Sequence, residues 1–193
     1  MRILIDLQGA QSTSRFRGIG RYSLSLALAM ARNAGDHEIW LALNSAFPES
    51  ILYIRHAFEG LIAPERIRIF EVPTPAAEFK SENVWRLRAA EMIREQFLSH
   101  LKPDVIYISS LFEGYKDDAI TSINMFTSGI CTAVTLYDLI PYLNQQDYLA
   151  DSHQRDSYLL KLQSLKKADL LLAISHSSEC EATEVLQFQP GQV

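Results

Sequence analysis

The chain has 193 residues, of which 48% are hydrophobic and 21% charged, close to the averages for soluble globular proteins. This length suits one α/β domain with a full core. The net charge of −5 at pH 7 argues against a nucleic-acid-binding protein, which normally carries a strong basic excess.

Six short apolar runs predict buried strands. Segments with helical periodicity separate them, which predicts βαβ crossovers and a mainly parallel sheet with helices on both faces. We therefore expect a Rossmann-like, doubly wound α/β fold. The runs are Ile3–Ile5, Ile39–Leu43, Ile67–Phe70, Val105–Ile108, Thr132–Leu136 and Leu170–Ile174.

The longest helical pattern runs from Glu82 to Leu101, and Pro103 ends it. Its apolar residues recur at steps of three and four, so we predict that they form one buried face. These residues are Trp85, Ala89, Met92, Ile93, Phe97 and Leu101.

Other helix starts carry recognisable signals. A helix is expected from about Gly20 to Arg32. Asp151 with Gln154, and Ser178 with Glu181, have the spacing of capping boxes on either side of the sixth strand.

No metal site or cofactor site is predicted. Cys131 and Cys180 match no zinc or redox spacing, and the five histidines form no His-x-x-x-His pair. The apolar run that begins at Ile3 stops at Asp6, which is too short for a signal peptide. We therefore expect a cytoplasmic protein.

Ligands of open parallel sheets bind beyond the carboxyl ends of the strands, so the loops there are of interest. The loop from Gln8 to Arg21 contains Gly18 and Gly20 but lacks the third glycine of a dinucleotide fingerprint and the Gly-Lys of a P-loop. Its pattern fits a phosphate-binding loop and a flexible connection equally well.

Polar residues follow three other strands. Ser109, Ser110 and Glu113 are suited either to sugar hydroxyls or to turns and caps. Asp138 follows the fifth strand, where its carboxylate either faces a ligand or accepts hydrogen bonds from nearby backbone amides. Ser175 follows the sixth strand at a helix start, a position typical of a cap.

Four stretches together resemble the N-terminal domain of family 4 glycosyltransferases, which have the GT-B fold. They look closest to bacterial enzymes that build O-antigen and related surface polysaccharides, often mannosyltransferases. The stretches are Arg2–Leu7 with Arg17–Tyr22, Tyr107–Tyr115, Val134–Tyr142 and Ala168–Ala182.

The resemblance implies two Rossmann-like domains that face a cleft, with residues 1–193 as the single acceptor-side domain. The C-terminal nucleotide-sugar-binding domain, with its Glu-x7-Glu signature, is absent from this chain, so we expect the chain alone to be inactive. The implied reaction is a retaining, metal-independent transfer of a sugar, with mannose as the candidate, from a nucleotide-sugar to a growing glycan or lipid-linked acceptor. The implied location is the inner face of the cytoplasmic membrane.

The resemblance also implies roles for individual residues. Asp138 would line the cleft near the reacting sugar as the catalytic residue, and Gly18, Gly20 and Arg21 would form the donor-phosphate loop. Many family members have His where this chain has Tyr137. Unlike His, a tyrosine phenol does not take up an extra proton and become positively charged near neutral pH, which puts any role of that His in question. The expected acceptor or cleft contacts are Ser109, Glu113, Tyr137 and Ser175.

Basic and aromatic residues along the long helical segment suit a peripheral membrane contact, as related enzymes have. Because acidic residues are interleaved with them, a solvated helix face also explains the pattern. The residues are Lys80, Trp85, Arg86, Arg88, Arg94 and Lys102.

Two other functions compete with glycosyl transfer. One is a stand-alone, non-catalytic binding or regulatory domain of flavodoxin-like form. The other is a sugar-nucleotide epimerase or dehydrogenase, which the missing third glycine and the lack of a Tyr-x-x-x-Lys pair disfavour. The fold alone does not separate the three.

Overall fold

The computed structural model describes residues 1–125, 127 and 129–193, and it confirms the predicted Rossmann-like α/β fold. All six predicted strands are present, and every adjacent pair is parallel. Their order in the sheet is β3-β2-β1-β4-β5-β6, so the order reverses between β1 and β4, where ligand crevices form in such sheets. The strands are β1 Arg2–Asp6, β2 Glu38–Asn44, β3 Ile67–Phe70, β4 Val105–Ile108, β5 Cys131–Leu136 and β6 Leu170–Ala173.

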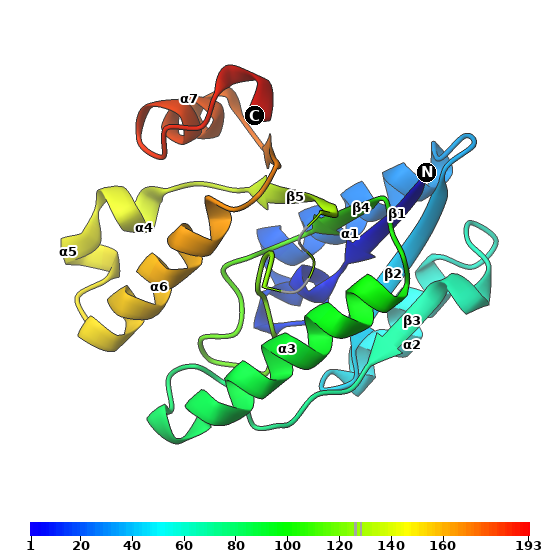
Figure 1. Cartoon of the computed structure of the whole chain (residues 1–193), viewed down its shortest axis with the longest axis horizontal. Helices are drawn as coiled ribbons and strands as arrows, with labels where there is room; N and C mark the ends of the chain where they lie inside the picture. Colours follow the sequence, from blue (N-terminus) through cyan, green and yellow to red (C-terminus); the bar gives the residue numbers. More distant parts are fainter. Residues whose placement is uncertain (126, 128) are drawn as a thin grey trace.

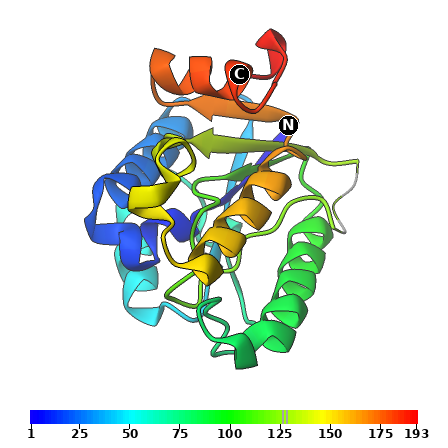
Figure 2. The same ribbon diagram turned by 90° about the vertical axis from the view of Figure 1, so that its left-hand side faces the viewer.

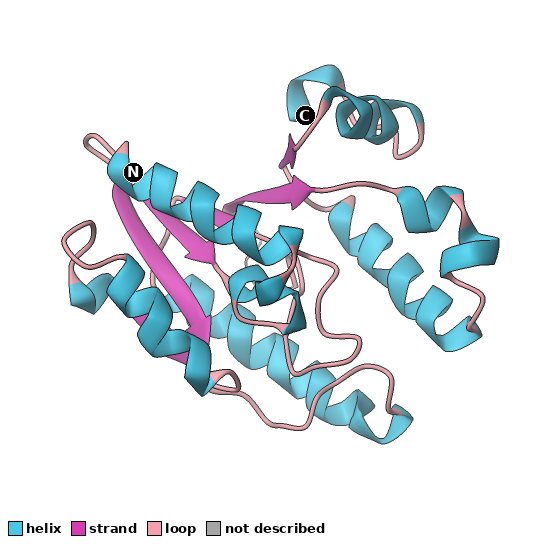
Figure 3. Cartoon of the chain, turned by 180° about the vertical axis from the view of Figure 1, so that it is seen from behind, coloured by secondary structure: helices cyan, strands magenta, loops and turns pink. Residues whose placement is uncertain are grey.

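Helices cover both faces of this sheet, as expected for βαβ crossovers. Helices α3 (Val84–His100) and α6 (Ser152–Leu165) lie in front of the sheet in Figure 1. Helices α1 (Gly18–Arg32) and α2 (Pro48–Ala57) cover the opposite face, which is turned to the viewer in Figure 3.

Two hydrophobic clusters bury the two faces, because successive side chains of a strand point to opposite sides. Leu4 of β1 belongs to the cluster under α3 and α6, while its neighbour Ile5 belongs to the cluster under α1 and α2. Both residues are fully buried. The strands are therefore apolar on both sides, which explains their continuous apolar runs.

The remaining helices are short, and α7 with the C-terminal segment packs at the β6 edge (Figure 2). One predicted cap is confirmed, because the Asp151 carboxylate accepts the Gln154 backbone N–H at 2.7 Å at the start of α6. These elements are α4 Ile140–Leu143, α5 Gln145–Tyr148, α7 His176–Glu184, and the 3-10 helices η1 Gln8–Ala10, η2 Thr13–Phe16, η3 Pro64–Arg66, η4 Ser81–Asn83 and η5 Pro190–Gln192.

The predicted capping box of Ser178 with Glu181 is wrong. Helix α7 begins earlier, and Ser175 is its N-cap, accepting the Ser178 backbone N–H at 3.2 Å. The hydroxyl of Ser178 instead donates to the carbonyl of Tyr137 at 2.7 Å. The Glu181 carboxylate accepts the Leu139 backbone N–H at 2.8 Å. Both side chains therefore tie α7 to the loop after β5.

The predicted buried face of α3 is wrong for three of its six residues. Trp85, Met92 and Ile93 are 64%, 48% and 43% exposed, whereas Arg94 is fully buried. The cause is the carboxylate of Asp6, which is buried at the end of β1 and requires a charged partner. The helix turns Arg94 toward it, and Trp85, Met92 and Ile93 consequently face outward, whereas Phe97 and Leu101 still pack against the core. Arg94 is thus unavailable for the membrane contact that its place in the sequence suggested.

Candidate functional site

The loops after β1, β4 and β5 meet at the carboxyl edge of the sheet, and Gly9 lies at their centre. A Cβ at Gly9 would lie 2.7 Å from Ser23 Oγ and 2.9 Å from Ser110 Cβ, so only glycine allows these elements to approach. The Gly9 backbone N–H donates to Ser109 Oγ at 3.3 Å. The first loop is therefore packed against the loop after β4 through its own backbone.

Glu113, a predicted cleft contact, is 5% exposed and lies in a cage of hydroxyl groups. Its Oε2 accepts hydrogen bonds from Ser12 at 2.7 Å and Ser14 at 3.1 Å, and its Oε1 accepts one from Ser110 at 2.9 Å. Burial raises the pKa of Glu113 above its ordinary value, although the serine hydroxyls counteract this. The carboxylate thus joins the 3-10 helix η2 to the loop after β4.

Tyr137 and Ser109 make a second link, between β5, β4 and the start of α1. The Tyr137 hydroxyl lies 3.1 Å from the Ser109 carbonyl oxygen, 3.3 Å from that of Ile19 and 3.0 Å from Ser23 Oγ. Burial raises the pKa of Tyr137 well above that of a free phenol, so this group stays neutral and hydrogen-bonded at any ordinary pH. Its ring also contacts Tyr22 edge-on at 5.6 Å.

Asp138 is exposed, in contrast to these buried residues. Its Oδ1 accepts the Ile140 backbone N–H at 3.0 Å, which fixes the direction of the carboxylate. The geometry is therefore compatible with both roles predicted for Asp138, a carboxylate that faces a ligand and an acceptor for nearby backbone amides. One oxygen accepts a backbone N–H, and the side chain remains open to solvent at the end of β5.

The predicted phosphate-loop residues lie at the start of α1 but differ in how exposed and how closely packed they are. Gly18 is exposed, and a Cβ there would contact nothing within 4 Å. A Cβ at Gly20 would lie 2.3 Å from Arg15 Cα and 2.5 Å from the Ser14 carbonyl oxygen. Gly20 is thus required for η2 to pack on α1. Arg21 is exposed on the first turn of the helix.

The structure brings Ser109, Glu113 and Tyr137 together around the first loop. Ser175 lies apart, exposed at the β6 end, where its side chain caps α7. Among residues 1–125, 127 and 129–193, no three His, Cys, Asp or Glu side chains form a group able to hold a metal ion. None of the helices in these ranges is long and apolar enough to cross a membrane.

The sequence reasoning missed a buried polar network beneath these loops. Arg94 donates to Asp6 Oδ2 through Nε at 2.7 Å and also through Nη2. The Gln8 side chain donates to both Asp6 oxygens at 3.1 Å, and its Oε1 accepts from Asn44 at 2.9 Å. The polar residues Asp6 and Asn44 at the ends of β1 and β2 are the only sequence signal of this network, and by themselves they predict no more than the end of each strand.

The chain is similar over its length to known mannosyltransferases. It is 37% identical over 194 residues to a "Serotype-specific mannosyltransferase WbdA" of Escherichia coli, and this match covers 100% of the chain and 23% of the relative. Two further WbdA proteins of Escherichia coli are 33% and 32% identical over 169 residues, covering 87% of the chain and 21% of each relative. No family model matches.

The chain therefore spans less than a quarter of the length of these curated relatives. The match at 37% identity includes all four stretches that carried the resemblance, because it extends over the whole chain. Together with the parallel Rossmann-like sheet, it identifies the chain as a Rossmann-like domain of the same family as the N-terminal part of the WbdA proteins.

Proposed function

We propose that this chain is the acceptor-side domain of a retaining, metal-independent glycosyltransferase that moves mannose from a nucleotide-sugar to a growing bacterial surface glycan. The observation that carries the proposal is the match over the entire chain to a protein named as a mannosyltransferase. A nucleotide-sugar-binding domain outside residues 1–193 would complete the cleft. The alternative of a stand-alone regulatory domain is not favoured, because the relatives are named as transferases.

The start of α1 is suited to the donor phosphates. Arg17 is the N-cap but gives no side-chain hydrogen bond to the first turn, and that turn contains no acidic residue. Free backbone N–H groups and the positive end of the helix dipole favour an anion there. Gly18 leaves the approach open, and Arg21 adds a positive charge. In this proposal Gly20 acts indirectly, by allowing η2 to pack beside the site.

Asp138 is the residue that we place nearest the reacting sugar. Its exposed carboxylate is oriented by the Ile140 amide at the carboxyl end of β5, where a fixed negative charge is available to a bound sugar. Ser109, Glu113 and Tyr137 hold the surrounding loops through buried atoms. We therefore assign these three residues a supporting role, one layer beneath the acceptor.

The test uses the complete gene product that contains this chain, with GDP-mannose as donor and a mannose-terminated oligosaccharide as acceptor. Asp138→Asn should lower kcat at least about tenfold while leaving the melting temperature unchanged, because an exposed carboxylate contributes little to the core. Asp36→Asn is the matched control, since Asp36 is also an exposed aspartate and lies just before β2, at the opposite edge of the sheet.

Full activity of the Asp138→Asn variant would contradict its assigned role, and absence of any transfer by the native protein would contradict the function. Two further measurements address the finer claims. The product should have the same anomeric configuration as the donor, and activity should persist in EDTA. An inverted product or complete loss of activity in EDTA would refute the corresponding part of the proposal.

A further inference from the structure

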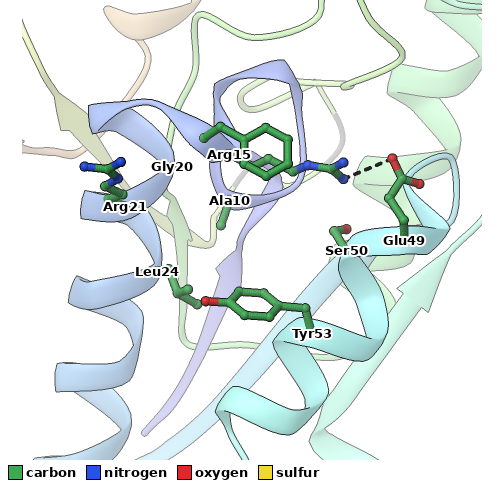
Figure 4. A pocket seen from close by; sticks show the side chains of 9 residues that line it. Ala10, Arg15, Gly20, Arg21, Leu24, Glu49, Ser50 and Tyr53 are labelled. Atoms are coloured by element: carbon green, nitrogen blue, oxygen red, sulfur yellow. Dashed lines mark hydrogen bonds and ion pairs between the residues drawn. The ribbon is translucent and has the colours of Figure 1, made fainter.

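A cavity of about 330 Å³ lies between the starts of α1 and α2, beneath the 3-10 helix η2 (Figure 4). Both helices begin at the carboxyl edge of the sheet, so the cavity opens at the same edge as the proposed acceptor site. Its volume is at the lower end of the range of about 300 to 1,000 Å³ typical of small-molecule sites. Gly20 and Arg21 of its lining belong to the proposed donor-phosphate region, whereas Arg15, Phe16, Glu49 and Tyr53 have no part in the proposed reaction.

Two exposed aromatic side chains border this cavity. Phe16 at the end of η2 is 75% exposed, and Tyr53 of α2 is 63% exposed. The ring of Tyr53 extends from α2 toward Leu24 of α1 and spans one side of the cavity (Figure 4). Sugar rings present faces of C–H bonds that pack on aromatic rings, so such rings beside a cavity suit a carbohydrate.

A charged pair supplies the polar side of the cavity. Arg15 Nη1 donates to Glu49 Oε1 at 3.0 Å, as the dashed line in Figure 4 marks, and the Arg15 guanidinium lies 4.5 Å from the centre of the Phe16 ring. The backbone N–H of Glu49 itself, and then Arg15, hold the pKa of this carboxyl below its usual value. Glu49 is therefore an ionised acceptor at neutral pH.

The pair determines which ligand fits. A guanidinium has five N–H donors, and within the described part of the chain Arg15 uses one of them, on Glu49. Donors and acceptors side by side match the hydroxyl groups of a neutral sugar, each of which both donates and accepts. Arg21 also lines the cavity, but its side chain points away from the Arg15–Glu49 pair (Figure 4). The Glu49 carboxylate would repel a phosphate or a nucleotide, although Arg15 alone would attract one.

We propose that this cavity is a distal acceptor subsite that binds one mannose unit of the glycan away from the reacting end. The inference rests on the function proposed above. The first turn of α1 separates the cavity from β5, because Tyr137 contacts that turn at Ile19 while Gly20 and Leu24 line the cavity. A glycan must therefore extend past the start of α1 to reach both Asp138 and this subsite.

The binding test titrates residues 1–193 with mannotriose by calorimetry and by chemical-shift changes in NMR spectra. Native protein should bind, and Tyr53→Ala should weaken binding about tenfold, because it removes an aromatic face from the sugar. Glu49→Gln should also weaken binding. Leu52→Ala is the matched control, since Leu52 neighbours Tyr53 on α2, is 76% exposed and does not line the cavity.

A kinetic test on the complete gene product separates this subsite from the reaction itself. Tyr53→Ala should raise KM for mannotriose about tenfold while leaving kcat, and KM for a single methyl mannoside, unchanged. If mannose transfer is normal and the mannotriose KM does not change, the subsite is wrong and the function stands.

Three other outcomes are also decisive. If mannotriose binding depends on Tyr53 but the complete gene product transfers no sugar, the proposed function is refuted and the cavity is still supported as a glycan-binding site. Binding of GDP or inorganic phosphate at Tyr53 in place of mannotriose would overturn the glycan assignment. No mannotriose binding by residues 1–193, or binding that Tyr53→Ala leaves intact, would overturn the subsite as well.

Discussion

Replacing Arg94 by Met should strongly destabilise the chain, because it leaves the Asp6 carboxylate buried without its cation. The two side chains are 0% and 1% exposed. Arg94 donates twice to Asp6, and its Nη1 donates to the Ser122 carbonyl oxygen at 3.1 Å. Removing one partner of such a buried pair costs about 3 to 5 kcal/mol.

The lower end of that range is expected here, because Asp6 would keep two donors. The backbone and side-chain N–H groups of Gln8 lie 3.2 Å and 3.1 Å from its oxygens. With a loss of about 3 kcal/mol and a urea m value of about 3 kcal/mol per M, the unfolding midpoint should fall by about 1 M.

Urea unfolding followed by circular dichroism measures this shift, and α3 offers a matched control. Arg88 on the same helix is 58% exposed and pairs at 2.8 Å with Glu91, whose side chain is 8% exposed. Solvent reaches this pair from the arginine side, so Arg88→Met should cost less than Arg94→Met, about 1 to 2 kcal/mol. Adding Asp6→Asn to Arg94→Met should restore part of the stability, because it removes the unpaired charge. Equal midpoints for Arg94→Met and Arg88→Met would refute this reasoning.

Two further predictions concern the loops at the carboxyl edge. The folded state holds the Glu113 proton more tightly than the unfolded state, because burial raises its pKa above the ordinary 4.5. As pH rises from about 4.5 through the raised pKa, the native protein should therefore lose stability relative to Glu113→Gln, and above that pKa the difference should stay constant. Urea midpoints of the two proteins measure this, and a difference that does not change with pH would contradict it. Gly20→Val should cost about 1 to 3 kcal/mol because its Cβ meets backbone atoms of η2, whereas Gly18→Ala should be neutral or slightly stabilising. Thermal unfolding compares the two variants, and equal melting temperatures would count against the packing role of Gly20.

The strands and the sheet could be predicted from the sequence, because a parallel sheet buried on both faces leaves continuous apolar runs. Ile67–Phe70 and Val105–Ile108 were predicted to the residue. The ends of β1 and β2 extended further than the apolar runs, into Asp6 and Asn44. Polar side chains there remain in the strands because the Gln8 and Arg94 network satisfies them.

The orientation of α3 could not be predicted from periodicity alone. Its apolar residues recur at helical spacing, yet a single long-range ion pair between Arg94 and Asp6 fixes which face turns inward. Residues 88 positions apart carry no local signal of such a pairing. The exposed Trp85 shows that apolar periodicity indicates an amphipathic helix but does not by itself identify the buried side.

The site could be predicted only in part, because it too depends on contacts between residues far apart in the sequence. The strand-end rule identified the right loops, and Ser109, Glu113 and Tyr137 do converge there. Their burial was not predictable, because it depends on Gly9 and Ser12 of the first loop closing over residues about 100 positions away. Whether Asp138, Gly18, Gly20, Arg21 and Ser175 act in sugar transfer stays a prediction.

The central claim is that residues 1–193 bind the acceptor by themselves, whereas donor binding also requires the part of the complete protein outside these residues, with the start of α1 contributing only to the donor phosphates. Calorimetric titration with GDP-mannose and with mannotriose tests this most directly, using both residues 1–193 and the complete gene product. The account predicts that the complete protein binds both ligands and that residues 1–193 bind mannotriose alone. Tight binding of GDP-mannose by residues 1–193 would contradict it and would make this chain the nucleotide-binding half.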